Sequence, residues 1–266
     1  MPSQLAARAL AFADGSGVPV PARRAATVIL MRPAEAFEVF ALRRVSTMEF
    51  APSMYVFPGG SVDARDAQAQ VGWAGPAPEW WASRLGLAEP DARAVVCAAI
   101  REVFEECGVL LAGVDESTVV GDVSGDEWEA ARLALLAREV ALADLLESRG
   151  LIVRSDLLVP WARWLTPDFE PRRFDTFFFL ARMPMGQRTR DVGGEADHSL
   201  WAAPADLVTL PMLPPTVHTL RQLAALGTID AALAASISHV LSTPLAPRVE
   251  LDGEGVWLVV DPRSGI

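Results

Sequence analysis

The stretch Ala99–Leu111, which reads AIREVFEECGVLL, constrains the fold of this chain more than any other. Wound as a helix at about 100° per residue, it places Glu105 about 60° to one side of Glu102 and Glu106 about 40° to the other. The three carboxylates therefore share one narrow face. The opposite face is apolar and is expected to bury against a sheet; it carries Val96, Ile100, Val103, Phe104 and Cys107. Gly108 supplies the left-handed residue that ends many helices.

The position of these acids is unfavourable for an ordinary surface helix. Carboxylates in a last turn face the negative end of the helix dipole, and like charges three and four residues apart repel each other. A local rule broken in this way often marks a functional site, and a hard divalent cation with oxygen ligands compensates the charge. We therefore assign Glu102, Glu105 and Glu106 as candidate ligands of Mg²⁺ or Mn²⁺. The alternative is an acidic surface helix with Arg101 as its internal partner.

A glycine turn lies upstream of this helix. Tyr55–Gly60 (YVFPGG) reads as a short apolar strand that runs into a Pro-Gly-Gly turn, where a backbone can approach a ligand or a helix closely. Strand, turn and acidic helix together resemble the Nudix box, G-x5-E-x7-R-E-U-x-E-E-x-G-U, in which U is aliphatic. Gly60 matches the glycine of the box. The second half of the box is matched by Arg101, Glu102, Val103, Glu105, Glu106, Gly108 and Val109.

The first half of the box departs from the pattern. The box places 13 residues between its glycine and its arginine, whereas Ser61–Ile100 separates them here. Counting back eight residues from Arg101 meets an arginine, Arg93, where the pattern has glutamate. We therefore expect an insertion at about residues 64–90 to split the box, and Asp63 is the candidate replacement for the acid that follows the paired glycines.

A split box is typical of one branch of the Nudix family. The peroxisomal coenzyme A diphosphatases and their bacterial relatives also carry a V-F-P-G-G strand end and an R-R-F-D-T stretch, found here at Arg172–Thr176. The resemblance covers about residues 24–225. It implies an α/β fold, the Nudix α/β/α sandwich with a mixed central sheet, extended by C-terminal helices. It also implies an enzyme, a pyrophosphohydrolase that uses a divalent metal to cleave the diphosphate linkage of a nucleoside diphosphate derivative, best coenzyme A or acyl-CoA.

The resemblance assigns further roles at this centre. Arg101 orients the metal-binding glutamates from behind, and Gly59 and Gly60 bring the turn close to the acidic helix and the substrate. One departure bears on the substrate: an arginine and a glycine known from CoA-specific Nudix enzymes align with Glu49 and Ser53 here. NADH, ADP-ribose and dinucleoside polyphosphates therefore stay alternatives. A non-catalytic Nudix-fold module that binds a nucleotide is the alternative of another class.

Several arginines are candidate substrate ligands. Arg172 and Arg173 offer planar forks to a phosphate or carboxylate, and the alternative is a structural ion pair with Asp175 ahead of a buried strand. Arg43 and Arg44 end the second of two β-rich runs, so either one faces the substrate or lies on the surface. We retain Arg44, Arg172 and Arg173 as substrate-binding candidates.

The general base is the least explicit part of the site. The polar loop Asp191–Ser199 contains two glycines and precedes a short strand end. Glu195 in this loop is our candidate base or further metal ligand, with Asp197 as a second candidate. Glu170 is the rival, and a helix glutamate can also double as base. His198 is interpreted as a hydrogen-bonding loop residue.

Composition limits the partners of the chain. Its 23 basic residues are all arginine and face 34 acidic ones, which gives a net charge of −11 and argues against nucleic acid as a partner. A small nucleotide substrate is compatible with this charge, because a metal and a few arginines can bind it locally. Cys97 and Cys107 lie roughly 15 Å apart on one helix and cannot pair. With no signal peptide, no run of 18 apolar residues and no peroxisomal C-terminal tripeptide, we expect a cytoplasmic protein without a membrane partner.

The remaining chain is expected to be one domain with additions. Residues 1–24 are predicted to be partly ordered, and residues 25–266 form the Nudix domain, with a helical insertion at about 125–150 and a helical and hairpin extension at about 214–266. Helices are predicted at 78–85, 125–137, 140–149, 216–226 and 229–241, and a hairpin at 249–260. The first insertion holds Trp73, Trp80 and Trp81, so it caps the site, builds the face of a homodimer, or packs as a satellite.

Overall fold

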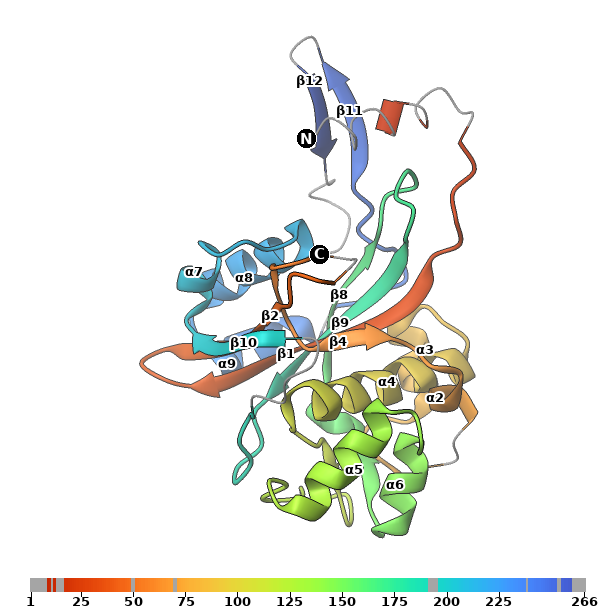
Figure 1. Ribbon diagram of the computed structural model, residues 1–266, viewed down its shortest axis with the longest axis vertical. Coiled ribbons are helices and arrows are strands. Elements are labelled where there is room, and N and C mark those ends of the chain that lie inside the picture. Colours follow the sequence, from red (N-terminus) through yellow and green to blue (C-terminus); the bar gives the residue numbers. More distant parts are fainter. Residues whose placement is uncertain are drawn as a thin grey trace.

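The centre of the fold is a mixed sheet of seven strands (Figure 1). This computed structural model describes residues 9–10, 12, 17–48, 51–68, 71–190, 196–237, 239–252 and 255–259. The strand order is β10-β2-β1-β9-β8, with β3 paired to β2 and β4 paired to β1. Their bounds are β1 (Arg23–Pro33), β2 (Phe37–Arg44), β3 (Tyr55–Val56), β4 (Gly59–Ser61), β8 (Val159–Leu165), β9 (Phe174–Arg182) and β10 (Ala196–Ala202). Strands β1 and β9 run parallel and the other pairs antiparallel, so the predicted mixed sheet is confirmed.

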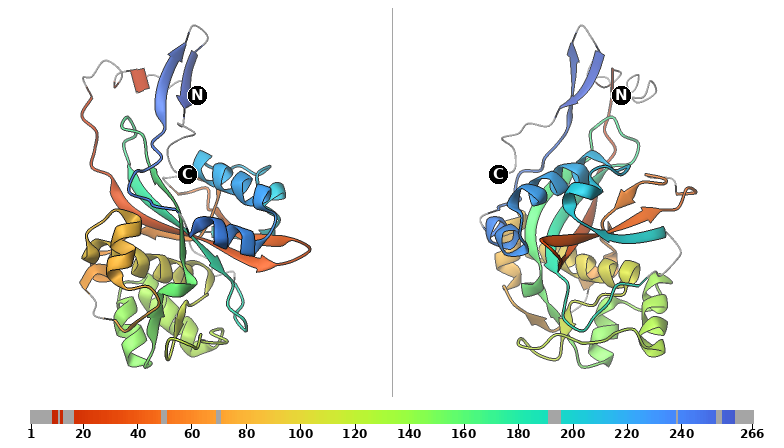
Figure 2. Two further views of the ribbon diagram at one scale, coloured as in Figure 1. Left: turned by 180° about the vertical axis from the view of Figure 1, so that it is seen from behind. Right: turned by 90° about the vertical axis from the view of Figure 1, so that its left-hand side faces the viewer.

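Helices cover both faces of this sheet (Figure 2). One face carries α2 (Ala64–Gln68), α3 (Pro78–Leu85), α4 (Glu89–Cys107), α5 (Asp126–Leu136) and α6 (Leu142–Ser148). The other face carries α7 (Pro204–Leu207), α8 (Pro214–Leu226) and α9 (Ile229–Ser236). Two smaller sheets are added, one of β5 (Trp73–Ala74), β7 (Ile152–Arg154) and β6 (Ala112–Gly113), the other of β11 (Arg248–Asp252) and β12 (Gly255–Val259). A single 3₁₀ turn, η1 (Ser155–Leu157), precedes β8. The arrangement is the predicted α/β/α sandwich.

The central strands are apolar on both faces because helices bury both. In β1, Val28 and Leu30 pack into the cluster that contains the inner face of α4. The alternating residues, Ile29 and Met31, pack into the cluster that contains α8 and α9. All four side chains are fully buried. This two-sided burial explains why the strand reads as a continuous apolar run.

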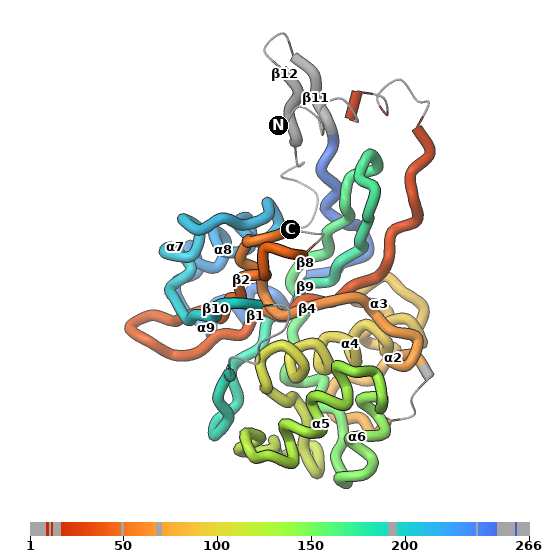
Figure 3. The backbone as a smooth tube through the Cα atoms, in the orientation of Figure 1, coloured from red at the N-terminus to blue at the C-terminus, as the bar shows by residue number. Residues whose placement is uncertain are grey.

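The turn that follows β3 fills a gap in the sheet. Strands β1 and β2 pair only where Met31–Pro33 meets Phe37–Val39, and then they diverge. Beyond that point β3 pairs with β2 and β4 pairs with β1, so the segment between them spans the gap, as Figure 3 shows along the orange tube. Gly59 and Gly60 lie opposite Thr27 and Ala26. This path brings the glycine turn against α4.

The acidic helix has the predicted stop and the predicted buried face. Gly108 adopts a left-handed backbone (φ 69°) and its N–H donates to the carbonyl of Phe104. Val96, Ile100, Val103, Phe104 and Cys107 are fully buried. The predicted helix at 78–85 is observed with those bounds as α3. Among the described residues, no helix is long and apolar enough to cross a membrane.

Candidate active site

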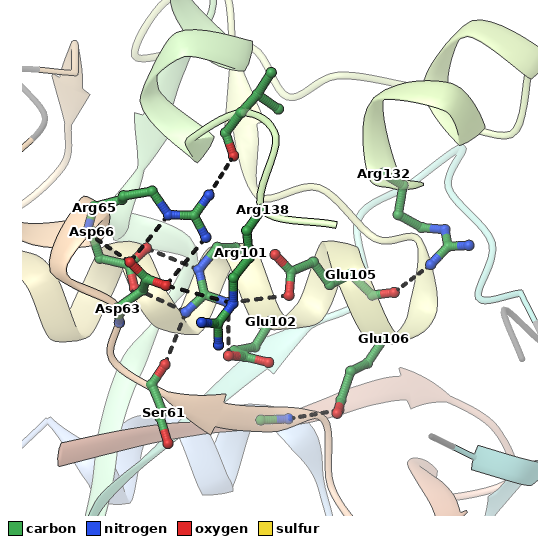
Figure 4. Close-up of polar contacts among 12 residues, drawn as sticks. Ser61, Asp63, Arg65, Asp66, Arg101, Glu102, Glu105, Glu106, Arg132 and Arg138 are labelled. Atoms are coloured by element: carbon green, nitrogen blue, oxygen red, sulfur yellow. Dashed lines mark hydrogen bonds and ion pairs between the residues drawn. The ribbon is translucent and has the colours of Figure 1, made fainter. Parts of the chain in front are cut away.

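Arg101 is the centre of the polar network on α4 (Figure 4). Its guanidinium is buried, and Nε and Nη2 each donate to one carboxylate oxygen of Asp66 at 2.9 Å. Nη1 donates to Glu102 at 2.8 Å and to Glu105 at 3.1 Å. Nη2 also donates to the carbonyl of Ser61 at 3.0 Å. All five N–H groups of the side chain therefore have acceptors, and one cation fixes three acids.

The glycine turn contacts two of the glutamates on α4, Glu102 and Glu106. A Cβ atom at position 60 would lie 2.5 Å from Oε1 of Glu102, so a larger residue there would force this carboxylate to move. The backbone N–H of Gly59 donates to Oε2 of Glu106 at 2.8 Å. The turn thus contributes close approach at one residue and a hydrogen-bond donor at the other. At Gly59 and Gly60 the turn thus lies in close contact with the acidic helix.

Two arginines from other segments meet the C-terminal end of α4. Arg132 of α5 is 1% exposed and donates through Nη1 to the carbonyl of Glu105 at 2.8 Å. The backbone N–H of Arg190 donates to the carbonyl of Cys107 at 3.0 Å. Glu129 accepts hydrogen bonds from both guanidinium groups. The last turn of α4 contains no basic residue of its own. Arg132 and Arg190, from other parts of the chain, place positive charge there and stabilise the negative end of the helix dipole.

The buried acids carry more negative charge than Arg101 offsets. Burial raises the pKa of Glu102 to about 7; Arg101 opposes this rise, and the neighbouring charge of Glu105 adds to it. Burial also raises the pKa of the Glu105 carboxyl, again against the pull of Arg101. A further cation close to these carboxylates would favour their charged forms.

The donor chemistry fits a hard divalent cation. Glu102, Glu105 and Glu106 project oxygen ligands from two adjoining turns of one helix. In this structure Glu102 and Glu105 turn toward Arg101, and Glu106 turns toward Gly59. Within the described part of the chain, no three acidic, histidine or cysteine side chains stand at metal-ligand spacing. The site thus has the ligand types, and its carboxylates have to turn to share one ion.

Asp66 is a site residue that the sequence comparison missed. It is 4% exposed and lies six positions after Gly60, which is the place of the glutamate in the G-x5-E half of the box. Counting back from Arg101 obscured this match, because the interruption follows Asp66. Asp63, the replacement offered by the sequence, instead binds Arg65 at the start of α2. The box is therefore split between Asp66 and Arg101, with its first half intact in spacing.

The structure separates the roles of Arg43 and Arg44. Nε of Arg43 donates to Oδ1 of Asp197 at 2.7 Å, and this bond is the main cause of a lowered pKa of the Asp197 carboxyl. Arg44 lies two residues after Leu42, whose side chain packs in the same cluster as α4. Since side chains alternate along a strand, Arg44 is on the face of the sheet that α4 covers.

Arg172 and Arg173 lie outside the carboxylate centre. They lie just before β9, in the β8–β9 turn, which points away from α4 in Figure 1. Arg173 donates to two backbone carbonyls and pairs with Asp168. Asp175 forms its ion pair with Arg163, through two bonds of 2.7 Å. These contacts favour the structural interpretation of this stretch.

The candidate bases differ in what the structure says of them. Glu195 lies outside the described residues, between Arg190 and the start of β10 at Ala196. Glu170 is half-buried in the β8–β9 turn, and its N–H donates to the carbonyl of Pro167. That turn is remote from α4, so Glu170 is not brought to the carboxylate centre (Figure 1).

A family model described as the NUDT19 Nudix domain matches residues 76–213, more than half of the chain. The chain belongs to the Nudix hydrolase family. Nudix hydrolases generally use a divalent metal, which agrees with the oxygen-rich site on α4. The crystal structure of a NUDIX hydrolase from Alicyclobacillus acidocaldarius is 30% identical, with a TM-score of 0.69, and the match covers 81% of this chain and 96% of that one.

Two curated relatives share one name, acyl-coenzyme A diphosphatase NUDT19. The protein from Gallus gallus is 28% identical over 209 residues, covering 65% of this Nudix hydrolase and 55% of the relative. The protein from Homo sapiens is 28% identical over 236 residues, covering 72% and 62% respectively. The matches thus span less than two thirds of the length of these relatives.

Proposed function

We propose that this protein is a divalent-metal-dependent diphosphatase that cleaves the diphosphate linkage of coenzyme A or an acyl-CoA. The observation that carries the proposal is the network on α4, in which Arg101 holds Glu102 and Glu105 while Gly59 binds Glu106. A module that only binds nucleotide has no need of buried, crowded carboxylates of this kind. The names of the matched relatives support a CoA substrate.

Each residue of the network has a proposed task. Glu102, Glu105 and Glu106 would hold Mg²⁺ or Mn²⁺, which supplies positive charge to the diphosphate oxygens and lowers the pKa of a coordinated water. Arg101 fixes the carboxylates from behind and favours their ionised forms against the effect of burial. Arg44, on the α4 face of the sheet, is proposed to bind a phosphate of the substrate.

A substrate panel tests this proposal. With Mn²⁺ or Mg²⁺, we expect the highest kcat/KM for CoA or a CoA ester, giving phosphopantetheine and 3′,5′-ADP from CoA. The panel includes NADH, ADP-ribose, diadenosine polyphosphates and nucleoside triphosphates, with a chelator as the control. Preference for NADH or ADP-ribose with CoA inert would remove the substrate proposal and keep the chemistry. No turnover of any compound, with nucleotide binding retained, would favour the non-catalytic module.

A second test concerns the general base, which we propose to be Glu195. Glu195→Gln is expected to lower kcat roughly 10²–10⁴-fold, because it removes the group that accepts the proton of the attacking water. KM and metal affinity should change little, and the acidic limb of the kcat–pH profile should disappear. Glu170→Gln is the matched control. Loss of the acidic limb in that variant alone would move the role to Glu170.

Three other inferences from the sequence stay predictions: the cytoplasmic location, the homodimer, and the choice between Mg²⁺ and Mn²⁺. The same applies to Arg172 and Arg173 as substrate ligands, and the contacts of Arg173 favour a structural role for that residue. Metal preference is measured directly by titrating each ion into the metal-free protein and following turnover.

A further inference from the structure

Helix α2 and the segment between α5 and α6 meet beside the carboxylate centre. Arg65 lies in the intact first half of the box, at the start of α2, and donates through Nη1 to the carbonyl of Val140 at 3.1 Å, between α5 and α6 of the helical insertion. In the other direction, Nε of Arg138, in the turn after α5, lies 3.9 Å from Oδ2 of Asp63. Figure 4 draws Arg65 and Arg138 next to Arg101 and its acids. One residue of the box, Arg65, and one residue of the later helical insertion, Arg138, therefore place two cations at the edge of the site.

Arg138 is held in an unusual backbone conformation. Its φ is +60°, a left-handed value that residues with a Cβ atom adopt at a cost. Backbone hydrogen bonds fix the turn, since the N–H of Arg138 donates to Leu135 and that of Glu139 to Ala134. Glycine would be the easier residue here, and Gly86 and Gly108 occupy other left-handed positions of this chain. Ala51 and Ser53 also have left-handed values, so the strain at Arg138 bears on function only together with its place at the edge of the site.

The two arginines differ in how firmly they are bound. Arg65 grips both oxygens of Asp63, at 3.1 and 3.2 Å, and this bond is the main cause that lowers the pKa of the Asp63 carboxyl to about 2. The Arg138 side chain is 77% exposed, and its ion pair with the same aspartate is long. Arg138 is thus an exposed guanidinium group, held in place by its backbone, whose long ion pair with Asp63 leaves its other N–H groups accessible to a second anion.

We propose that Arg138, with Arg65 beside it, binds a phosphomonoester group of the substrate that is separate from the hydrolysed diphosphate. A phosphomonoester carries close to two negative charges at neutral pH, and it matches the planar fork of arginine. The inference rests on the proposed function, because coenzyme A carries such a group at its ribose 3′ position whereas NADH and ADP-ribose do not. The helical insertion that carries Arg138 then serves substrate selection.

The test compares CoA with 3′-dephospho-CoA. In Arg138→Gln, the ratio of kcat/KM for CoA to that for 3′-dephospho-CoA is expected to fall at least tenfold, because a charge-assisted hydrogen bond is lost only with the substrate that has the phosphate. Arg221→Gln is the matched control: it removes an exposed arginine from α8, on the other face of the sheet, and should leave the ratio unchanged. An unchanged ratio in Arg138→Gln would overturn the proposal.

A second variant separates binding from fold stability. Arg138→Gly keeps the left-handed turn and removes its strain, so we expect Tm to stay level or rise by roughly 1–4 °C while the same ratio falls. If Arg138 had a purely structural role, Arg138→Gly would instead lower Tm and leave the ratio of kcat/KM values unchanged. That pair of results would overturn the proposal even if Arg138→Gln failed to fold.

Nucleotide binding measured at equilibrium, without turnover, tests the phosphomonoester site independently of the proposed reaction. In metal-free wild-type protein, 3′,5′-ADP should bind at least tenfold more tightly than 5′-AMP, and the difference should disappear in Arg138→Gln. Inorganic phosphate is the third ligand: if it displaces 3′,5′-ADP only at millimolar concentration, the site recognises the substrate rather than free phosphate. Equal binding of 3′,5′-ADP and 5′-AMP by the wild type would overturn the subsite, whichever substrate the enzyme hydrolyses.

Discussion

Glu105→Gln is expected to lower kcat by roughly 10²-fold or more at saturating Mg²⁺, because the proposed metal contributes several kcal/mol to the transition state. The fold should survive, since glutamine keeps the shape of the side chain and can still accept the 3.1 Å hydrogen bond from Arg101. The metal-free variant should be no less stable than the wild type. Replacing Glu105 with glutamine removes a buried negative charge that repels Glu102 and raises the pKa of Glu102, so it relieves this repulsion in the metal-free protein.

Steady-state kinetics with Mg²⁺ titration and thermal unfolding of the metal-free protein measure these effects. Glu89→Gln is the matched control, because Glu89 is an exposed acid in the first turn of the same helix. It should change kcat little and lower stability by no more than about 1 kcal/mol through the helix dipole. Near-full activity of Glu105→Gln at saturating Mg²⁺ would show that Glu105 is not a metal ligand.

The local parts of the site were predictable because short-range rules determine them. Helical spacing placed the three glutamates on one face, and a glycine at position 108 predicted the helix end that the structure has. Helix α3 has the bounds predicted from the sequence, 78–85. These features depend on residues within a few turns of one another, which a single sequence reveals directly.

The tertiary parts of the site were not visible in the same way. Asp66 reaches Arg101 across an insertion, so counting from the arginine fails and only counting from Gly60 finds it. Arg132 and Arg190 meet the end of α4 from distant segments, and nothing in their local sequence indicates that contact. A long-range ion pair depends on the packing of whole elements, which local spacing does not encode.

Arg101→Met is expected to cost roughly 3–5 kcal/mol of stability near pH 8, the range found when one partner of a buried ion pair is removed. Methionine fills a similar volume, so the loss comes mainly from leaving Asp66, Glu102 and Glu105 without their shared cation. The measurement is urea unfolding of metal-free wild type and variant at pH 5 and pH 8.

The pH dependence gives the sign of this effect. In the wild type, Arg101 holds down the pKa values of Glu102 and Glu105, which burial raises. Without that cation, the folded-state pKa values of these acids rise further above their unfolded values. An acid whose pKa is higher in the folded protein than in the unfolded chain stabilises the fold at a pH below its unfolded-state pKa. This contribution is lost as the pH rises through its folded-state pKa.

The deficit of Arg101→Met relative to wild type should therefore be small at pH 5, where the buried acids can take up protons, and large at pH 8. Adding Asp66→Asn to the variant should recover part of the loss at pH 8, because it removes one of the uncompensated charges; coupled residues of this kind are not additive. An equal deficit at both pH values would mean that Arg101 stabilises the fold by packing and hydrogen bonding, and that the charge of the three acids contributes little.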